Sequence, residues 1–441
     1  MRASYDFKGR FFRLSAVNLL TNVTVPLVGL VDTAMLGHLA DIRFLAGTAL
    51  ASVLFDYVFW TFGFLRMGAT GTTAQAVGRG DTVEVHLVLY RFLTVAGALG
   101  VALVIAQWPI REAGFWLLSG EPHVEAAGRE YFDARIWSAP ATLCSYAFLG
   151  WYLGREESRH ALVMTVIGNL ANVALNWVFI MRLGWAAWGA GLATTLSAYL
   201  MLAVALGIFR GLGPPVPWRW SEVLHRGKVR TLSRLNFDIM IRTFCLETAF
   251  AVFTNFSSLM GTTVLAANAV ILRLLLLASY LIDGAAYAAE SLAGIFHGQR
   301  DAARLRGVVR LSLLSGLAFS ILFLAAFGLA PETWYGLLTS HDEITATASR
   351  YHLWLVPVLL FGSLAYMYDG IFLGLTAGRA LRNSMLASLL LGFLPVAVVA
   401  RRFDEPHVLW IALVVFMVAR AATLGVASRD LLRSAGAGPP V

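Results

Sequence analysis

The chain has 441 residues, of which 58% are hydrophobic and only 14% are charged, and its mean hydropathy is +0.70. Soluble domains carry about a quarter charged residues, so this composition excludes an ordinary water-soluble protein. The formal net charge of +8 is dispersed among short connections instead of clustering with aromatic residues, which argues against a nucleic-acid partner.

Apolar runs of about twenty residues recur along the whole chain, and each is long enough to cross a hydrocarbon core about 30 Å thick. Transmembrane barrels use alternating strands of about ten residues, so these longer runs predict helices and an all-α integral membrane protein. We place the twelve transmembrane helices at residues 12–37, 46–72, 87–109, 131–154, 161–182, 186–209, 236–258, 264–294, 308–330, 351–375, 382–400 and 407–428.

Positive charge gathers in alternate connections. Arg155, Arg159 and the basic residues of 219–234 fall on the same side as the N-terminus, whereas opposite connections such as residues 121–125 are acidic. Because cytoplasmic loops are enriched in lysine and arginine, both termini are predicted to be cytoplasmic. The expected location is the plasma (inner) membrane, with multiple passes.

An internal repeat appears when the chain is slid against itself by about 220 residues. Asp81 then meets Asp301, and Gly154 meets Gly374, in an almost gap-free match that covers five helices. One constant offset over that length indicates duplication. The two halves are therefore expected to share one six-helix fold.

The longest polar connection contains three prolines and divides the chain almost in half. It predicts an N-terminal lobe at residues 1–212, a cytoplasmic linker at 213–235 and a C-terminal lobe at 236–441. Six spans per lobe give both lobes the same orientation in the membrane, related by an axis along the membrane normal. Such an architecture places a cavity between the lobes.

Asp32 is the most informative polar residue, because a carboxylate at the bilayer centre costs roughly 2.5–3.5 kcal/mol on insertion scales. Pro26 loosens the helix beside it. Asn172 and Asn176 share one helix face, and Thr194 reaches a similar depth. Carboxylate, amide and hydroxyl oxygens together would form a hard-cation or proton site. The alternative is that the amides and the hydroxyl only hydrogen-bond neighbouring helices.

Two acids in the second half, Glu247 and Asp369, are candidates for a second cation or substrate site. The alternative is neutralisation by an arginine, and Arg242 stands five residues before Glu247. Either outcome would satisfy a buried carboxylate.

Three further charged residues lie toward the cytoplasmic side on helices that the repeat makes equivalent: Arg66, Asp283 and Glu290. An ion pair between the lobes would close that side. This gate is a hypothesis, and a charge reversal at Arg66 that left transport and folding untouched would remove it.

Motifs of other function classes are absent from the sequence. It contains no GxxxxGK[ST] phosphate loop and therefore encodes no ATP motor. Neither HExxH nor GxSxG occurs, so a membrane enzyme lacks an obvious catalytic centre. We expect no catalytic residues, no cofactor and no metal apart from Na⁺, with a transmembrane H⁺ or Na⁺ gradient as the energy source.

Several strings resemble the multidrug and toxic compound extrusion (MATE) family, and specifically its DinF branch, over essentially the whole chain. They are Val25-Pro26-Leu27 with Gly29-Leu30-Val31-Asp32-Thr33-Ala34 and Gly37-His38, Phe64-Leu65-Arg66-Met67, Asn268-Ala269-Val270, Asp283-Gly284 with Glu290, and Asp369-Gly370 with Gly374. The resemblance implies a V-shaped pair of six-helix bundles that alternates access. It also implies export of cationic or amphipathic compounds against H⁺ or Na⁺.

The resemblance extends to the site residues. Asp32 looks like the helix 1 carboxylate on which coupling depends in many members, and Asn172, Asn176 and Thr194 fall where a first-lobe cation site has been described. Relatives often carry an aspartate where this chain has Asn176, and losing a carboxylate weakens a Na⁺ site more than a proton site. Proton coupling is therefore favoured, while the two second-lobe acids, which look like those of the NorM branch, keep Na⁺ open.

The sequence thus predicts a secondary active multidrug antiporter, not an enzyme. Protonation of Asp32 would bend helix 1 and displace the substrate. The alternatives are an exporter or flippase of lipid-linked or polysaccharide precursors, and a membrane-embedded enzyme. Expected partners are small-molecule substrates and the lipid bilayer, with the protein acting as a monomer.

Overall fold

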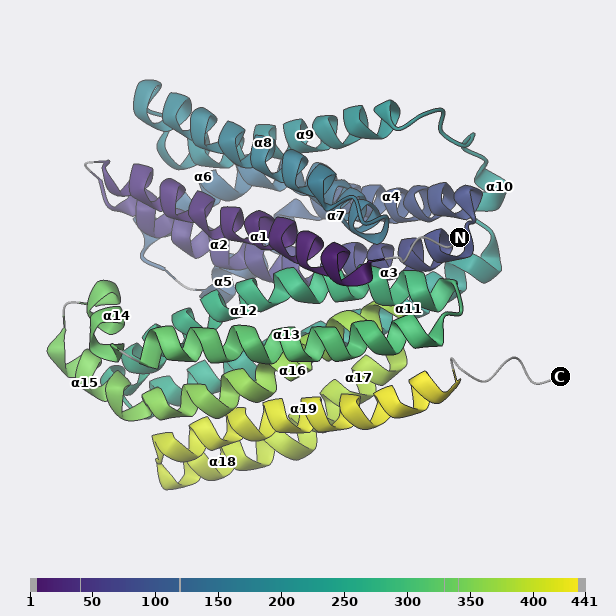
Figure 1. The fold of residues 1–441 in the computed structure, drawn as a ribbon. Helices are drawn as coiled ribbons and strands as arrows, with labels where there is room; N and C mark the ends of the chain where they lie inside the picture. The colour runs from purple at the N-terminus through teal and green to yellow at the C-terminus, as the bar shows by residue number, and fades with distance from the viewer. Residues whose placement is uncertain (1–5, 40, 119, 329, 340, 435–441) are drawn as a thin grey trace. The chain divides into compact units, whose positions relative to one another are not determined.

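A computed structural model describes residues 6–39, 41–118, 120–328, 330–339 and 341–434, and the side chains at positions 25–28, 30, 32, 430 and 432–434 lie outside that description. Every element of the described chain is helical (Figure 1). The chain forms two compact units, which we call the first unit (Leu20–Ser233) and the second unit (Met1–Leu19 with Arg234–Val441).

The first unit begins within α1, whose N-terminal part belongs to the second unit. Its helices are listed here in chain order: α1 (Phe7–Gly37), α2 (Arg43–Thr61), α3 (Phe64–Arg79), α4 (Thr82–Ile105), α5 (Gln107–Leu118), α6 (Pro122–Arg135), the 3-10 turn η1 (Ile136–Ser138), α7 (Ala139–Gly154), α8 (Ser158–Asn176), the π-helix η2 (Trp177–Arg182), α9 (Ala186–Gly211) and the short α10 (Trp220–Val223).

The second unit holds the remaining helices, apart from the first residues of α11 (226–233), and includes a second π-helical segment. They are α11 (Arg226–Leu259), α12 (Thr262–Gly298), α13 (Ala302–Gly328), α14 (Pro331–Leu338), α15 (Asp342–Tyr351), the 3-10 turn η3 (His352–Trp354), α16 (Leu355–Gly374), α17 (Gly378–Ala387), the π-helix η4 (Ser388–Phe393), α18 (Leu394–Phe403) and α19 (Pro406–Ser434).

Within the described residues, nine helical segments are long and apolar enough to cross a membrane. The other three predicted spans also fall on helices, namely α1, the α6–α7 segment and α11. The apolar part of α11 contains Arg242 and Glu247, and charged residues of this kind lower the hydropathy of a span. The prediction of a multi-spanning helical protein is therefore confirmed.

The second predicted span, residues 46–72, is interrupted. α2 ends at Thr61, Gly63 adopts a turn, and α3 begins at Phe64. Glycine is unfavourable inside a helix by about 1 kcal/mol relative to alanine, which makes this position a natural place for the break. The equivalent stretch of the second unit lies inside the continuous 37-residue helix α12. The two units therefore differ here despite their common origin.

Close helix packing follows the internal repeat. A Cβ on Gly154 of α7 would lie 2.6 Å from the carbonyl oxygen of Thr70 in α3. A Cβ on Gly374 of α16 would lie closer still to the carbonyl oxygen of Glu290 in α12. Both the glycines and their carbonyl partners are separated by the same offset of about 220 residues, and small residues permit such close approach in membranes. The duplication is therefore built into the helix contacts of each unit.

The turns that precede α4 and α13 repeat the same geometry. Gly80 and Arg300 both have positive φ, at 72° and 57°. The aspartate that follows each one accepts a hydrogen bond from the backbone N–H three residues on, at 2.9 Å for both Asp81 and Asp301. Aspartate is a preferred helix N-cap because it satisfies an otherwise unpaired N–H. The aspartates aligned by the repeat are thus helix caps.

The connection between the halves is docked on the first unit. The Trp218 ring stacks on Tyr90 of α4 with centroids 4.5 Å apart, and the Tyr90 hydroxyl donates to the Val216 carbonyl at 2.7 Å. Arg91 donates to the Glu222 carbonyl at 3.1 Å, and Val223 is fully buried. The proline-rich segment is therefore held against α4 by aromatic and polar contacts that its composition did not predict.

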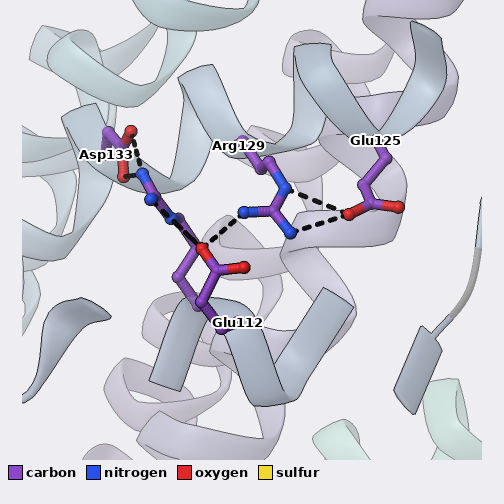
Figure 2. Close-up of polar contacts among 5 residues, drawn as sticks. Glu112, Glu125, Arg129 and Asp133 are labelled. Carbon is purple, nitrogen blue, oxygen red and sulfur yellow. Dashed lines mark hydrogen bonds and ion pairs between the residues drawn. The ribbon is translucent and has the colours of Figure 1, made fainter. Parts of the chain in front are cut away.

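An ion-pair network joins α5 to α6 at one end of the first unit (Figure 2). Arg129 lies between two acids, 2.6 Å from Glu112 and 2.8 Å from Glu125. Arg111 contacts Asp133 at 2.6 Å and Glu112 at 3.2 Å. The hydrogen bond from Arg129 lowers the pKa of Glu112 below its ordinary value of 4.5. The network therefore ties the short helix α5, most of which follows the third predicted span, to its neighbour α6.

Glu112→Gln is expected to speed amide hydrogen exchange in α5 at neutral pH, because it removes the only charged partner in α5 that the described structure gives Arg129. A lowered carboxyl pKa stabilises the folded state above the unfolded value of 4.5, and that contribution is lost as the pH falls through the folded pKa. The difference in exchange rate between variant and wild type, each measured at the same pH, should therefore vanish in acid below the folded-state pKa of Glu112. Glu121→Gln, at a more exposed acid, is the control. An equal difference at neutral and acid pH would contradict the network's role.

Candidate functional site

Three of the predicted residues meet in the first unit. Asn172 and Asn176 lie one turn apart in α8, and the Asn176 amide donates to the Asn172 side-chain oxygen at 3.0 Å. The Asn172 amide donates to the Thr194 hydroxyl of α9 at 3.3 Å. Both asparagines are buried, and Ser197 lies 3.5 Å from the Asn172 amide. Sequence spacing thus predicted a real polar cluster between α8 and α9.

A π-helix, η2, follows this cluster directly, starting at Trp177. π-helical turns are rare and are frequently found at functional sites, because each inserts a residue and shifts the register of the side chains beyond it. The second unit carries its own π-helix, η4, between α17 and α18. The cluster therefore sits beside a locally irregular stretch of its helix.

Asp32 lies in α1, and its side chain is outside the described part of the chain. Its height can still be placed from the backbone. The Asn169 amide of α8 donates to the Thr24 hydroxyl of α1 at 3.0 Å. α1 and α8 contain the first and fifth predicted spans, so they run in the same direction. Position 32 lies about 12 Å beyond Thr24, and Asn176 lies about 10 Å beyond Asn169, which brings them to a similar depth.

Asn172→Ala is expected to destabilise the protein by roughly 1–3 kcal/mol, because it removes both buried hydrogen bonds through which Asn172 joins Asn176 and Thr194. Asn169→Ala is the matched control on the same helix. It removes one interhelical hydrogen bond and should cost only about 1 kcal/mol. Thermal unfolding of the purified variants in detergent measures both changes. Equal losses of stability for the two variants would show that the Asn172 cluster contributes no more than a single interhelical hydrogen bond.

Asp369 of α16 is held by two arginines from two other helices. Arg242 of α11 and Arg420 of α19 both donate to its Oδ2 atom, Arg420 at 2.6 Å. The Asp369 side chain is 5% exposed and that of Arg420 is fully buried. The Arg420 guanidinium also lies over the rings of Tyr366 and Phe416, at 5.3 Å and 5.5 Å. Asp369 is thus the carboxylate of a three-helix ion-pair cluster.

Arg242 therefore pairs with Asp369 and not with Glu247, the neighbour that sequence spacing suggested. Glu247 is half-buried in α11, and no described residue forms a hydrogen bond or ion pair with its carboxylate, although Arg242 acts on it through space. The two second-half acids predicted from sequence thus stand in different environments.

The residues of the predicted gate fall in different units. Arg66 is half-buried in α3 of the first unit, whereas Asp283 and the fully buried Glu290 belong to α12 of the second unit. Asp283 acts electrostatically on Arg242 within its own unit. The ion pair between the halves remains a hypothesis.

Two arginines, the buried Arg420 and the half-buried Arg135, were not singled out from the sequence. Arg420 stands alone in the apolar span of α19, and that isolation was the available signal, because an unpaired charge in a membrane is costly. Arg135, at the end of α6, donates to the Tyr131 hydroxyl at 2.8 Å and lies 4.6 Å from the centre of the Phe55 ring. Charged residues near span ends are common, so its position carried no such signal.

Comparison with known proteins identifies the family. The family model MatE matches residues 18–178 and 239–398, one segment in each half of the chain. The chain belongs to the MatE family. Members of this family are transporters, so the alternative of a membrane-embedded enzyme is wrong. The transporter is accordingly a multi-pass membrane protein.

Curated relatives cover nearly the full length of the transporter. It is 33% identical to DNA damage-inducible protein F of Escherichia coli K12, over 94% of this chain and 90% of the relative. It is 23% identical to the probable multidrug resistance protein NorM of Thermotoga maritima, over 94% and 91%. It is 26% identical to the multidrug resistance protein NorM of Vibrio cholerae, over 81% and 78%. The resemblance to the DinF branch is thereby confirmed.

Solved structures support the fold. A structure described as the outward-facing conformation of a multidrug resistance MATE family transporter aligns with a TM-score of 0.88 at 18% identity, covering 98% of this chain and 97% of that one. A MATE structure in a straight conformation aligns with the same score at 20% identity and the same coverage. The predicted fold class is therefore confirmed.

Proposed function

We propose that this transporter is a secondary active antiporter, which exports cationic or amphipathic small molecules in exchange for ions moving inward. The family and the relatives named as multidrug resistance proteins support export of small molecules. The observation that carries ion coupling is the common depth of position 32 and Asn176, beside the Asn172 and Thr194 side chains. A carboxylate at that depth needs a proton, a cation or water.

The first-unit cluster favours H⁺ over Na⁺. A Na⁺ ion requires several oxygen ligands, and carboxylates are the strongest of these. Asn176 supplies an amide in place of a second acid, and the Asn172 oxygen already accepts a hydrogen bond from it. We therefore assign the coupling proton to Asp32 and a supporting role to the amides, which would hydrogen-bond its carboxyl group.

A transport cycle follows from this assignment. Protonation of Asp32 from outside removes its charge, allows α1 to bend and displaces a cationic substrate outward, and reopening toward the cytoplasm releases the proton. One proton moving inward across 100 mV supplies roughly 2.3 kcal/mol, enough for a concentration ratio of about fifty for a substrate without net charge. For a monovalent cation the exchange is electroneutral, and the pH gradient supplies the driving force. The cycle needs both termini on the cytoplasmic side of the inner membrane, as the charge distribution predicts.

The test uses the purified transporter in liposomes with ethidium as substrate. A pH gradient and a Na⁺ gradient are imposed in separate experiments, and dye accumulation is followed by fluorescence. Accumulation driven by the pH gradient alone is the expected result. Accumulation driven by Na⁺ alone would instead assign ion coupling to the acids of the second unit. No response to either gradient would overturn the antiport proposal.

A further inference from the structure

Arg135 carries a positive charge in the first unit without a carboxylate bound to it. Its Nη1 atom donates to the Tyr131 hydroxyl at 2.8 Å, and its guanidinium lies 4.6 Å from the centre of the Phe55 ring and 5.9 Å from that of Phe59. No acid of the described chain forms an ion pair with it, and its Nε atom is buried without an acceptor. Aromatic rings stabilise such a cation, but the guanidinium still lacks a counter-ion.

Asp56 of α2 stands near Arg135 without contacting it. Arg135 acts on its carboxylate through space, yet no described residue donates a hydrogen bond to that carboxylate. Asp56 is exposed, although it falls inside the second predicted span. A carboxylate that faced lipid would be costly, so its exposure indicates a recess that water can enter.

A third polar group lies in the same region. Tyr146 of the neighbouring helix α7 senses the charges of both Asp56 and Arg135, and its hydroxyl has no hydrogen-bond partner in the part of the chain that the structure describes. Polar side chains from α2, α6 and α7 therefore gather here without bonding one another. Polar groups inside a protein are normally paired, so this arrangement indicates a site that water or a polar ligand occupies.

Aromatic side chains flank the same site. Tyr57 and Trp60 are both exposed on α2. Residues three and four apart share a helix face, so Trp60 lies beside both Tyr57 and Asp56. Ligand sites combine aromatic surface with a few polar groups that fix orientation. The region thus offers a cation, an anion and flat apolar surfaces for one small molecule.

The site lies at the depth of the proposed proton site. The Thr195 hydroxyl of α9 donates to the Ala134 carbonyl at 2.8 Å, which places the end of α6 beside Thr195. The preceding residue, Thr194, accepts the hydrogen bond from the Asn172 amide. A ligand held by Arg135 would therefore be close enough for protonation of the polar cluster to affect its binding.

We propose that Arg135 binds the anionic group of a substrate and Asp56 its cationic group, so that the first unit accepts zwitterionic aromatic compounds. The inference rests on the proposed export of small molecules and names a substrate class for it. A simple cation uses only Asp56 and the rings of α2, because the charge of Arg135 repels it. Recognition by Arg135 therefore depends on an anionic group of the ligand.

Equilibrium binding of rhodamine B to the transporter in nanodiscs tests this assignment without any ion gradient. Rhodamine B carries a carboxylate and a delocalised cation at neutral pH, and its ethyl ester has the same chromophore without the carboxylate. Fluorescence anisotropy, with empty nanodiscs as the blank, gives a dissociation constant for each. Arg135→Gln is expected to weaken binding of rhodamine B by about tenfold or more, and that of the ester by no more than about twofold.

Arg182→Gln is the matched control in the same unit. Arg182 also lies over an aromatic ring, that of Trp177 at 4.7 Å, but it is exposed and stands on η2. It should leave both dissociation constants unchanged. Asp56→Asn should weaken binding of both ligands, because each carries the cation.

Two results would overturn the inference: Arg135→Gln binding rhodamine B as wild type does, or losing affinity equally for the dye and the ester. Size-exclusion chromatography checks that each variant is folded. If Arg135→Gln is not folded, the wild-type protein decides. It must bind rhodamine B more tightly than the ester, and equal or weaker binding would contradict a role for Arg135.

Transport separates this inference from the proposed function. If neither ion gradient drives ethidium uptake, the antiport proposal fails, while the dissociation constants still decide the roles of Arg135 and Asp56. If a gradient drives uptake but Arg135→Gln binds both ligands like wild type, the inference fails and the antiport proposal survives.

Discussion

Replacing Asp32 by asparagine is expected to abolish ion-driven accumulation of substrate without unfolding the protein. The amide keeps the size and hydrogen-bonding ability of the side chain but cannot release a proton. Exchange of one proton for one ethidium cation moves no net charge, so the pH gradient alone drives it. Under a gradient of about 1.7 pH units, worth roughly 2.3 kcal/mol, the accumulation ratio should fall from about fifty in wild type to about one in the variant. Ethidium uptake into liposomes measures the ratio directly.

Asp41→Asn is the matched control for this variant. Asp41 follows α1 closely, is about half exposed and pairs with Arg43 at 2.9 Å, so it lies outside the polar cluster. It should transport like wild type. Full gradient-driven uptake by Asp32→Asn would remove the first-unit site from the coupling mechanism.

Arg420→Gln is expected to produce the largest loss of stability in the second unit, about 3–5 kcal/mol. The substitution removes one of two charges that balance the buried Asp369 and leaves the neutral amide among the Tyr366 and Phe416 rings. Breaking a buried ion pair costs more than the pair itself contributes, and here the buried carboxylate keeps only one of its two charged partners. Thermal unfolding in detergent measures the change.

Arg401→Gln serves as the control for Arg420. Arg401 is 42% exposed and contacts Asp404 at 3.4 Å, and pairs of this kind contribute little to stability. Its replacement should change the free energy of unfolding by no more than about 0.5 kcal/mol. Similar losses for the two variants would show that the Asp369 cluster is not a special element of the fold.

Hydropathy and the internal offset predicted most of the fold. The spans follow from apolar length, and the repeat forecast pairs that perform the same task in each unit, such as the helix caps Asp81 and Asp301. It also aligned Gly154 with Gly374, and each packs against a helix carbonyl. Local chemistry and a constant spacing are properties of the sequence itself, so recognising them requires no knowledge of how the helices pack.

Pairing between distant helices could not be predicted in the same way. Asp369 finds its partners 127 and 51 residues away, whereas spacing suggested Arg242 for Glu247 on the same helix. Helix periodicity fixes neighbours on one helix, but not which faces of other helices they meet. The Asn172 and Asn176 contact was predicted because both lie one turn apart on α8. The sequence did not predict that Trp218 docks on Tyr90, or that Arg420 pairs with Asp369, because both contacts join segments that are distant in the chain.

The most direct test of ion-coupled export runs the exchange backward. Liposomes containing the transporter are given an ethidium gradient with no ion gradient, and an internal pH indicator reports proton movement. An antiporter must move protons against the direction of the dye, and Asp32→Asn must not. Dye that crosses through wild-type protein without moving protons or Na⁺ would contradict the account.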